Sequence, residues 1–196
     1  MMYQILYLPV AFLITFLIEK TTNITPTINY ANKFEYVPIL TANIYADLII
    51  IFATFARIFY KSPSLEGWYK KYRLSAMIAD ILIGVLYILL ARYLVYVFKI
   101  KIGLTVFAVL CVAIQIFFDF LFFILFTVIP RGSNDMLDYF KGYSKEMGAY
   151  ALLGDSLLVI FAVIFSAFLN TQSFDTNIIA LIVSIYLAPY LIYMKD

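Results

Sequence analysis

The chain has 196 residues, of which 65% are hydrophobic, 19% are aromatic and only 13% are charged. A soluble domain is typically about 45–50% apolar and about 25% charged, so this composition predicts a protein whose solvent is lipid. The net charge of +2 is too small to argue for a nucleic-acid partner. We therefore expect an all-α fold, a polytopic transmembrane helical bundle forming a single domain over residues 1–196.

Rare residue types narrow the chemistry further. The chain has no histidine and one cysteine, Cys111, which lies within an apolar stretch. This excludes an intrachain disulfide, a cysteine or histidine metal site and a Ser-His-Asp triad, so that only oxygen ligands could hold a metal. The sequence also lacks a glycine-rich phosphate loop and a nucleophile elbow. It thus predicts no enzyme, no cofactor and no metal site.

Apolar stretches of membrane-spanning length recur along the chain, since a transmembrane helix needs about 20 mostly apolar residues. The six predicted spans are residues 1–18, 38–60, 74–98, 102–130, 148–169 and 177–194. The first is the shortest and contains Pro9, which lies near its start, where a missing N–H costs least.

The segment between the fourth and fifth spans predicts an interfacial amphipathic helix over residues 134–147. Its apolar face carries, at steps of three and four residues, Met136, Phe140, Tyr143 and Met147. Charged side chains occupy the opposite face, which is typical of a helix lying at a membrane surface. A helix packed on a partner protein would show the same pattern.

Lysine and arginine are distributed unevenly over the predicted loops. Segments 61–73 and 131–147 together with the C-terminus carry eight of these residues, and the opposite loops carry four. The positive-inside rule then predicts that both termini face the cytoplasm or its equivalent. The side chains on this side that we expect to meet partners or the membrane surface are Lys61, Trp68, Lys70, Lys71, Arg73, Met136, Phe140 and Tyr143.

Four charged residues lie within the second and third predicted spans. If these helices fold antiparallel about their loop, Asp47 lies level with Arg92, and Arg57 with Asp80. A charge at the centre of a membrane costs about 2.5–3.5 kcal/mol on insertion scales, which favours pairing. We interpret the four as two structural ion pairs that clamp the hairpin.

Two further acidic residues have no matching base in their own hairpin. Asp119 and Asp155 both fall in the inner half of the membrane, with Gln115 and Ser156 as neighbouring polar groups. Two carboxyls in a low dielectric cannot both ionise cheaply, so they would share a proton or a cation. The pattern indicates a proton or cation site, and the alternative is a hydrogen-bonded network with a structural role.

Two stretches within residues 72–155 resemble a group of uncharacterised multi-span membrane proteins of nucleocytoplasmic large DNA viruses. The first runs from Tyr72-Arg73-Leu74-Ser75-Ala76 through Ala79-Asp80 to Ala91-Arg92-Tyr93. The second comprises Gln115 to Asp119, Pro130-Arg131-Gly132, Asn134, Met136-Leu137-Asp138, Phe140-Lys141, Tyr143, Glu146, Gly148 and Asp155. The resemblance implies a protein of the virion's inner membrane or of its assembly site, and it implies no reaction.

The leading hypothesis is therefore a structural or assembly component of a viral internal membrane. Its candidate partners are the lipid bilayer, a capsid, other membrane proteins and further copies of the chain. The rival hypothesis is a transporter or channel in which Asp119 and Asp155 hold a proton or cation. A water-filled path past both carboxylates would distinguish the two.

Overall fold

The structure is a computed structural model that describes residues 6–58 and 62–194. Within these ranges all regular secondary structure is helical, which confirms the predicted fold class. Five stretches are long and apolar enough to cross a membrane. They are Lys33–Phe55, Leu74–Phe98, Leu104–Val128, Ala149–Leu169 and Phe174–Ile192.

The predicted first span is shorter than the other spans in the described part of the chain. Helix α1 covers Tyr7–Thr21, 15 residues, and residues 1–5 lie outside the described ranges. At 1.5 Å per residue α1 measures about 22 Å, less than the hydrocarbon core of about 30 Å. It packs against α5 and α7.

The second span ends earlier than predicted. A short 3₁₀ helix, Lys33–Glu35, leads into α2, Tyr36–Phe55. Residue Arg57, predicted inside the span, has a positive φ of 55° and lies beyond the helix end. The predicted basic loop then contains a helix of its own, α3, Pro63–Tyr72. The Ser62 side chain caps this helix by accepting a hydrogen bond from Leu65 N. Pro63 occupies the first helical position, and such a cap followed by a proline favours helix initiation.

The remaining helices follow the predicted order. They are α4 (Leu74–Phe98), α5 (Leu104–Val128), α6 (Asp135–Met147), α7 (Ala149–Leu169) and α8 (Phe174–Ile192). Helix α6 confirms the predicted short helix, and the Asn134 side chain caps it by accepting from Leu137 N.

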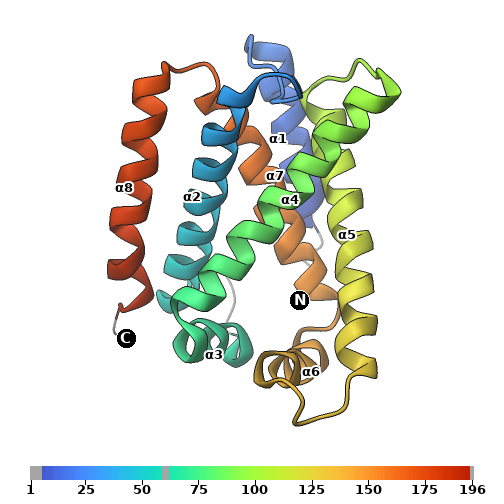
Figure 1. Ribbon diagram of the computed structural model, residues 1–196, viewed down its shortest axis with the longest axis vertical. Coiled ribbons are helices and arrows are strands. Elements are labelled where there is room, and N and C mark those ends of the chain that lie inside the picture. Colours follow the sequence, from blue (N-terminus) through green and yellow to red (C-terminus); the bar gives the residue numbers. More distant parts are fainter. Residues whose placement is uncertain (1–5, 59–61, 195–196) are drawn as a thin grey trace.

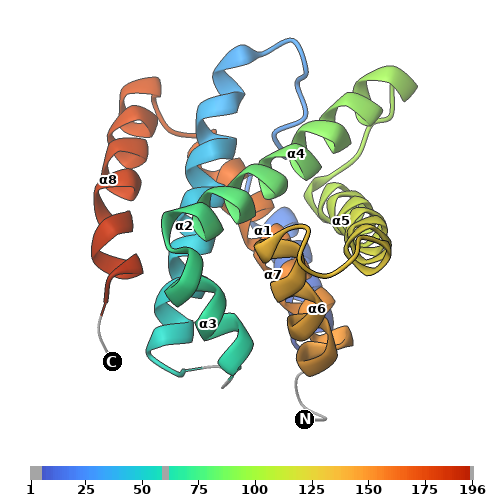
Figure 2. The same ribbon diagram turned by 60° about the horizontal axis from the view of Figure 1, so that its bottom comes forward.

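The long helices form an up-and-down bundle with a lid of short helices at one end. In Figure 1, α2, α5 and α8 descend, α4 and α7 ascend, and α3 and α6 lie together at the lower end. Figure 2, with the lower end brought forward, shows the same two short helices across the bottom of the bundle. The segments carrying most of the basic residues therefore share one end of the molecule, and the C-terminal end of α8 lies there too.

Packing divides the interior into two apolar regions. One lies among α2, α4, α5 and α7 and includes Ile88, Phe107 and Val163. The other lies among α2, α3, α4 and α8 and includes Trp68. Large apolar side chains such as Phe120 stay exposed on the outer faces of the long helices, as lipid contact requires.

Candidate functional site

The candidate site is a set of four acidic side chains near the lower end of the bundle. Asp47 of α2 is fully buried and accepts a 2.9 Å hydrogen bond from the Tyr69 hydroxyl of α3. Asp80 of α4 is half-buried and accepts a 3.0 Å bond from Trp68 Nε1, also of α3. Two adjacent aromatic residues of the lid thus hold two carboxyls of two spans, and these carboxyls lie within electrostatic range of each other.

The predicted clamp between Asp47 and Arg92 is wrong. The Arg92 guanidinium is fully buried and pairs with Glu35 at 3.0 Å. Its Nη2 also donates to Asn29 O at 2.6 Å. The segment before α2 folds back over the upper end of α4, so Arg92 meets a carboxylate that lies outside the hairpin helices.

The second predicted pair, Arg57 with Asp80, is also wrong. Arg57 lies past the end of α2 and pairs with Glu66 of α3 at 3.6 Å. The prediction assumed two straight helices joined by a loop. Helix α3 instead inserts between them and places Trp68 beside Asp80.

The second acidic pair sits in a polar network across α4, α5 and α7. Asp119 accepts a 2.9 Å hydrogen bond from the Tyr87 hydroxyl and a second bond from Gln115 Nε2. Ser156 donates to Gln115 Oε1 at 2.8 Å. The structure therefore brings the predicted residues Asp119, Gln115 and Ser156 together.

Asp155 differs from the other three acidic residues because it is exposed. It nevertheless lies within electrostatic range of Asp119 and Asp80, which belong to two other helices. Among the described residues it forms no ion pair and no hydrogen bond through its carboxyl. Asp155 is thus exposed while two carboxyls of other helices act on it electrostatically.

Tyr143 of the lid helix α6 also lies within electrostatic range of Asp155, Asp80 and Asp119. Burial, followed by the charges of Asp155 and Asp80, raises the pKa of its hydroxyl. A phenol that stays protonated can donate a hydrogen bond to a carboxylate or to a bound water. Tyr143, Tyr87 and Tyr69 were not predicted as part of this cluster, because a tyrosine in an apolar sequence carries no signal of the carboxyl it will meet.

The lid helices contact each other through charged and polar groups outside the membrane-spanning segments. Lys71 Nζ lies 2.8 Å from Asp135 Oδ2, and its hydrogen bond lowers the pKa of Asp135. Glu146 of α6 accepts bonds from Ser62 and Ser64 at the start of α3. Although burial opposes it, this bonding lowers the pKa of Glu146. Helices α3 and α6 therefore form one polar-fastened layer.

The predicted contact surface is partly internal. Trp68 is only 4% exposed, and its ring centroid lies 4.8 Å from that of Phe140 with the two rings tilted against each other. The Phe140 ring in turn packs on Phe122 of α5. Met136 packs against the same apolar region. The apolar face of α6 therefore meets the protein's own α3 and α5, and Trp68 is unavailable to a membrane surface.

The basic residues of the same prediction have mixed environments. Lys70 and Lys71 are exposed and pair with Glu66 and Asp135. Arg73 is half-buried and donates to Ile192 O, tying α4 to the end of α8. Lys61 lies outside the described residues.

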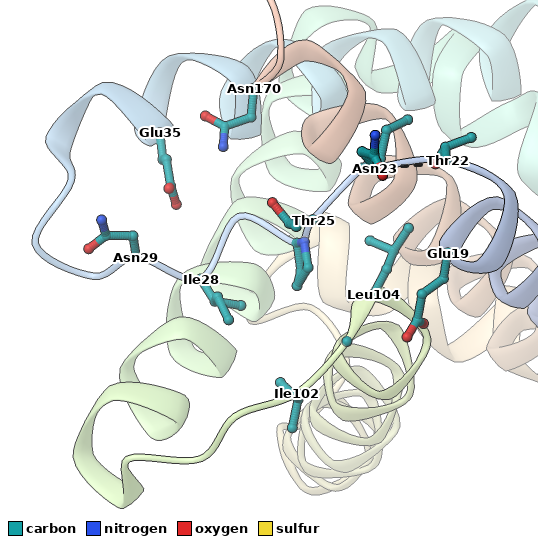
Figure 3. A pocket seen from close by; sticks show the side chains of 13 residues that line it. Glu19, Thr22, Asn23, Thr25, Ile28, Asn29, Glu35, Ile102, Leu104 and Asn170 are labelled. Carbon is teal, nitrogen blue, oxygen red and sulfur yellow. Dashed lines mark hydrogen bonds between the residues drawn. The ribbon is translucent and has the colours of Figure 1, made fainter.

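A separate pocket with both polar and apolar walls opens at the opposite end of the bundle (Figure 3). It has a volume of about 690 Å³ and lies between the segment after α1 and the start of α5. Glu19 and Glu35 lie in its wall, together with the side-chain amides of Asn29 and Asn170. Glu19 is held by Thr105, whose side-chain and backbone hydrogen bonds lower the pKa of that carboxyl. The bundle thus has carboxyl groups near both ends and an apolar layer between them.

Within the described part of the chain, no group of three acidic or sulfur side chains is arranged to hold a metal ion. No family model, curated protein or solved structure matches the sequence. The apolar helices define the chain as a multipass helical membrane protein. Any further function has to be argued from the acidic site itself.

Proposed function

We propose that the protein conducts a proton or a small monovalent cation through the membrane by way of Asp80, Asp119 and Asp155. The observation that carries the proposal is Asp155, which is exposed while two other carboxyls lie within its electrostatic range. Intramembrane carboxyls are costly, and they commonly mark ion or proton pathways. A bound cation or proton would remove most of that cost.

The hydrogen-bond partners of the carboxyls support the same proposal. Asp80 and Asp119 accept bonds only from neutral groups among the described residues, an indole N–H, a phenol and an amide. A structural ion pair would instead join each carboxyl to lysine or arginine. Neutral donors orient a carboxyl without satisfying its charge, which leaves that charge available for a mobile cation.

The path that the proposal requires has two ends. The pocket beside Glu19 and Glu35 would serve as the entrance at the upper end. The space beside Asp155 would serve the lower end, and the packed layer containing Ile88, Phe107 and Val163 separates the two. Passage would then require this layer to open, as in carriers that expose a site to one side at a time.

The alternative function is a viral membrane scaffold, supported by the charge clamp, the short loops, the lack of an evident catalytic group and the sequence resemblance. Both charge pairs have different partners, and much of the apolar lid face is used internally. The clamp therefore no longer supports a scaffold, and the other three arguments for it remain. Conduction is therefore the function that the geometry favours.

The test is a flux measurement on the purified protein in liposomes carrying a pH-sensitive dye, with an alkali-cation gradient in parallel samples. The protein should conduct, and the Asp119→Asn/Asp155→Asn double variant should fall to the level of protein-free liposomes. Asp175→Asn is the matched control, since Asp175 lies exposed in the first turn of α8, and it should conduct normally. Unchanged flux in a folded double variant would refute the proposal.

A further inference from the structure

The order of elements repeats once along the chain. Helices α2, α3 and α4 form a descending span, a short lid helix and an ascending span. Helices α5, α6 and α7 form the same series in the same direction (Figure 1). Because both copies begin at the same end of the bundle, an axis relating them would run along the bundle and not across it.

The joints of the two copies also match in detail. Each lid helix begins at a side-chain cap that accepts from the backbone N–H three residues on, Ser62 in one copy and Asn134 in the other. Each lid helix then joins its ascending span through one residue of positive φ. Arg73 has φ 51° and ψ −126°, and Gly148 has φ 53° and ψ −134°. An arginine would not adopt this conformation by intrinsic preference, so the shared angles reflect a shared architecture.

The acidic residues occupy equivalent places in the two copies. Asp80 follows Arg73 by seven residues, and Asp155 follows Gly148 by seven residues. In the descending spans, Asp47 lies eight residues before the end of α2, and Asp119 nine residues before the end of α5.

The aromatic partners of the ascending-span carboxyls are equivalent as well. Trp68, five residues before Arg73, donates its indole N–H to Asp80. Tyr143, five residues before Gly148, lies within electrostatic range of Asp155. Each lid helix therefore carries, at the same position, one polar aromatic residue that acts on the carboxyl of its own ascending span, by a hydrogen bond in one copy and electrostatically in the other.

The contacts between helices also match when the first copy (α2 to α4) is exchanged with the second (α5 to α7). Helix α2 packs against α4 and α7, and α5 packs against α7 and α4. The two lid helices pack on each other, while α8 flanks α2 as α1 flanks α5. Exchanging the copies leaves the neighbours among α2 to α7 unchanged, as a two-fold relation requires. The flanking helices lie outside this relation, because α1 also packs on α7 and α8 has no packing of similar extent on α4.

One buried atom in the first copy calls for a ligand. Asp47 Oδ2 is enclosed without a hydrogen-bond partner among the described residues, and it lies within electrostatic range of Asp80. A buried unpaired carboxylate oxygen costs several kcal/mol unless a proton, a cation or a water satisfies it. Asp47 Oδ2 is therefore an acceptor position that the described residues leave open.

We propose that the chain is an internal duplication whose two copies contribute Asp80 and Asp155 as equivalent ligands to one site on a pseudo-two-fold axis. The site takes a single proton or alkali cation, with Asp47 and Asp119 as the equivalent outer pair. The role of this site in conduction rests on the proposed function, whereas binding does not. Carriers built from repeats commonly place their sites at the interface between the copies.

The equivalence of Asp80 and Asp155 makes a more specific prediction about ligand binding than the conduction hypothesis does. If both carboxyls hold the same ion, loss of either one removes the site, and losing both removes nothing more. Asp80→Asn and Asp155→Asn should therefore weaken binding to the same extent as each other and as the double variant. Independent sites would instead give additive losses.

The experiment measures binding apart from flux. Thermal unfolding of the micelle-solubilised protein is followed against alkali-cation concentration at fixed pH, and against pH in a bulky organic cation. The unsubstituted protein and Asp175→Asn should be stabilised by one of these ligands, since a ligand of the folded state raises the unfolding midpoint. Both single variants and the double variant should lose that stabilisation alike.

More conservative variants test the same site with less risk that a loss of binding reflects misfolding. Trp68→Phe and Tyr143→Phe keep the aromatic rings but remove one donor from each copy, and they should shift the half-saturating ligand concentration in the same direction. Loss of binding in Asp80→Asn but not in Asp155→Asn would overturn the shared site. So would the absence of stabilisation by any ligand in the unsubstituted protein. Binding without flux would refute only the proposed function.

Discussion

Replacing Glu35 by glutamine should leave the Arg92 guanidinium buried and uncompensated. The pair joins Arg92 Nη2 to Glu35 Oε2 at 3.0 Å, and the side chains are 0% and 5% exposed. Breaking a buried ion pair from one side typically costs about 3–5 kcal/mol. Arg92 keeps its bond to Asn29 O and its contact with the Tyr36 ring, so we expect a cost near the lower limit, about 3 kcal/mol.

The reverse change should cost less. Arg92→Met removes the cation, and the remaining Glu35 can take up a proton instead of staying charged in an apolar environment. The double variant then lacks the buried charge altogether. We expect its free energy of unfolding to lie close to that of Arg92→Met, which corresponds to a coupling energy of about 3 kcal/mol, the cost of Glu35→Gln alone.

The assay is a double-mutant cycle on unfolding in mixed micelles. A second cycle pairs Arg92→Met with Asp47→Asn, the partner that a simple hairpin would supply. No ion pair or hydrogen bond joins Asp47 to Arg92, so their effects should add within about 0.5 kcal/mol. Strong coupling to Asp47 with additivity at Glu35 would refute the pairing described above.

Two further predictions concern the lid. Gly148→Ala should destabilise the protein by about 1–2 kcal/mol, because a φ of 53° strains the backbone of any residue with a Cβ. The new Cβ would contact no other atom, so no steric clash adds to this strain. Gly142→Ala lies in mid-helix with equally free space around the new Cβ and should stabilise the protein by about 0.5–1 kcal/mol. Changes of the same sign in the free energy of unfolding of the two variants would contradict this prediction. Because Lys71 lowers the pKa of Asp135, their contact stabilises the fold above about pH 3.9 and weakens as pH falls through the lowered value. Asp135→Asn should therefore flatten the acid-side decline of the unfolding midpoint, and an unchanged decline would exclude the contact's contribution.

Local patterns in the sequence were sufficient to predict the long helices and the short helix α6. Runs of about 20 apolar residues predicted the long spans, because the membrane imposes length and apolarity on any helix that crosses it. The step of three and four residues in 134–147 predicted α6, and Asn134 caps it as such a residue usually does. The grouping of Asp119 with Gln115 and Ser156 was also accessible, since all three lie at similar depth on adjacent spans.

Only the tertiary structure decided which charges meet. Depth along a helix is a one-dimensional quantity, whereas pairing also depends on rotation about the helix axis and on segments that fold back. Glu35 reaches Arg92 by such folding, and Trp68 reaches Asp80 because α3 is a helix and not a loop. The duplication was hidden for a related reason. Arg73 and Gly148 share backbone angles but no side-chain chemistry, so the likeness between the two copies lies in geometry that residue identity does not record.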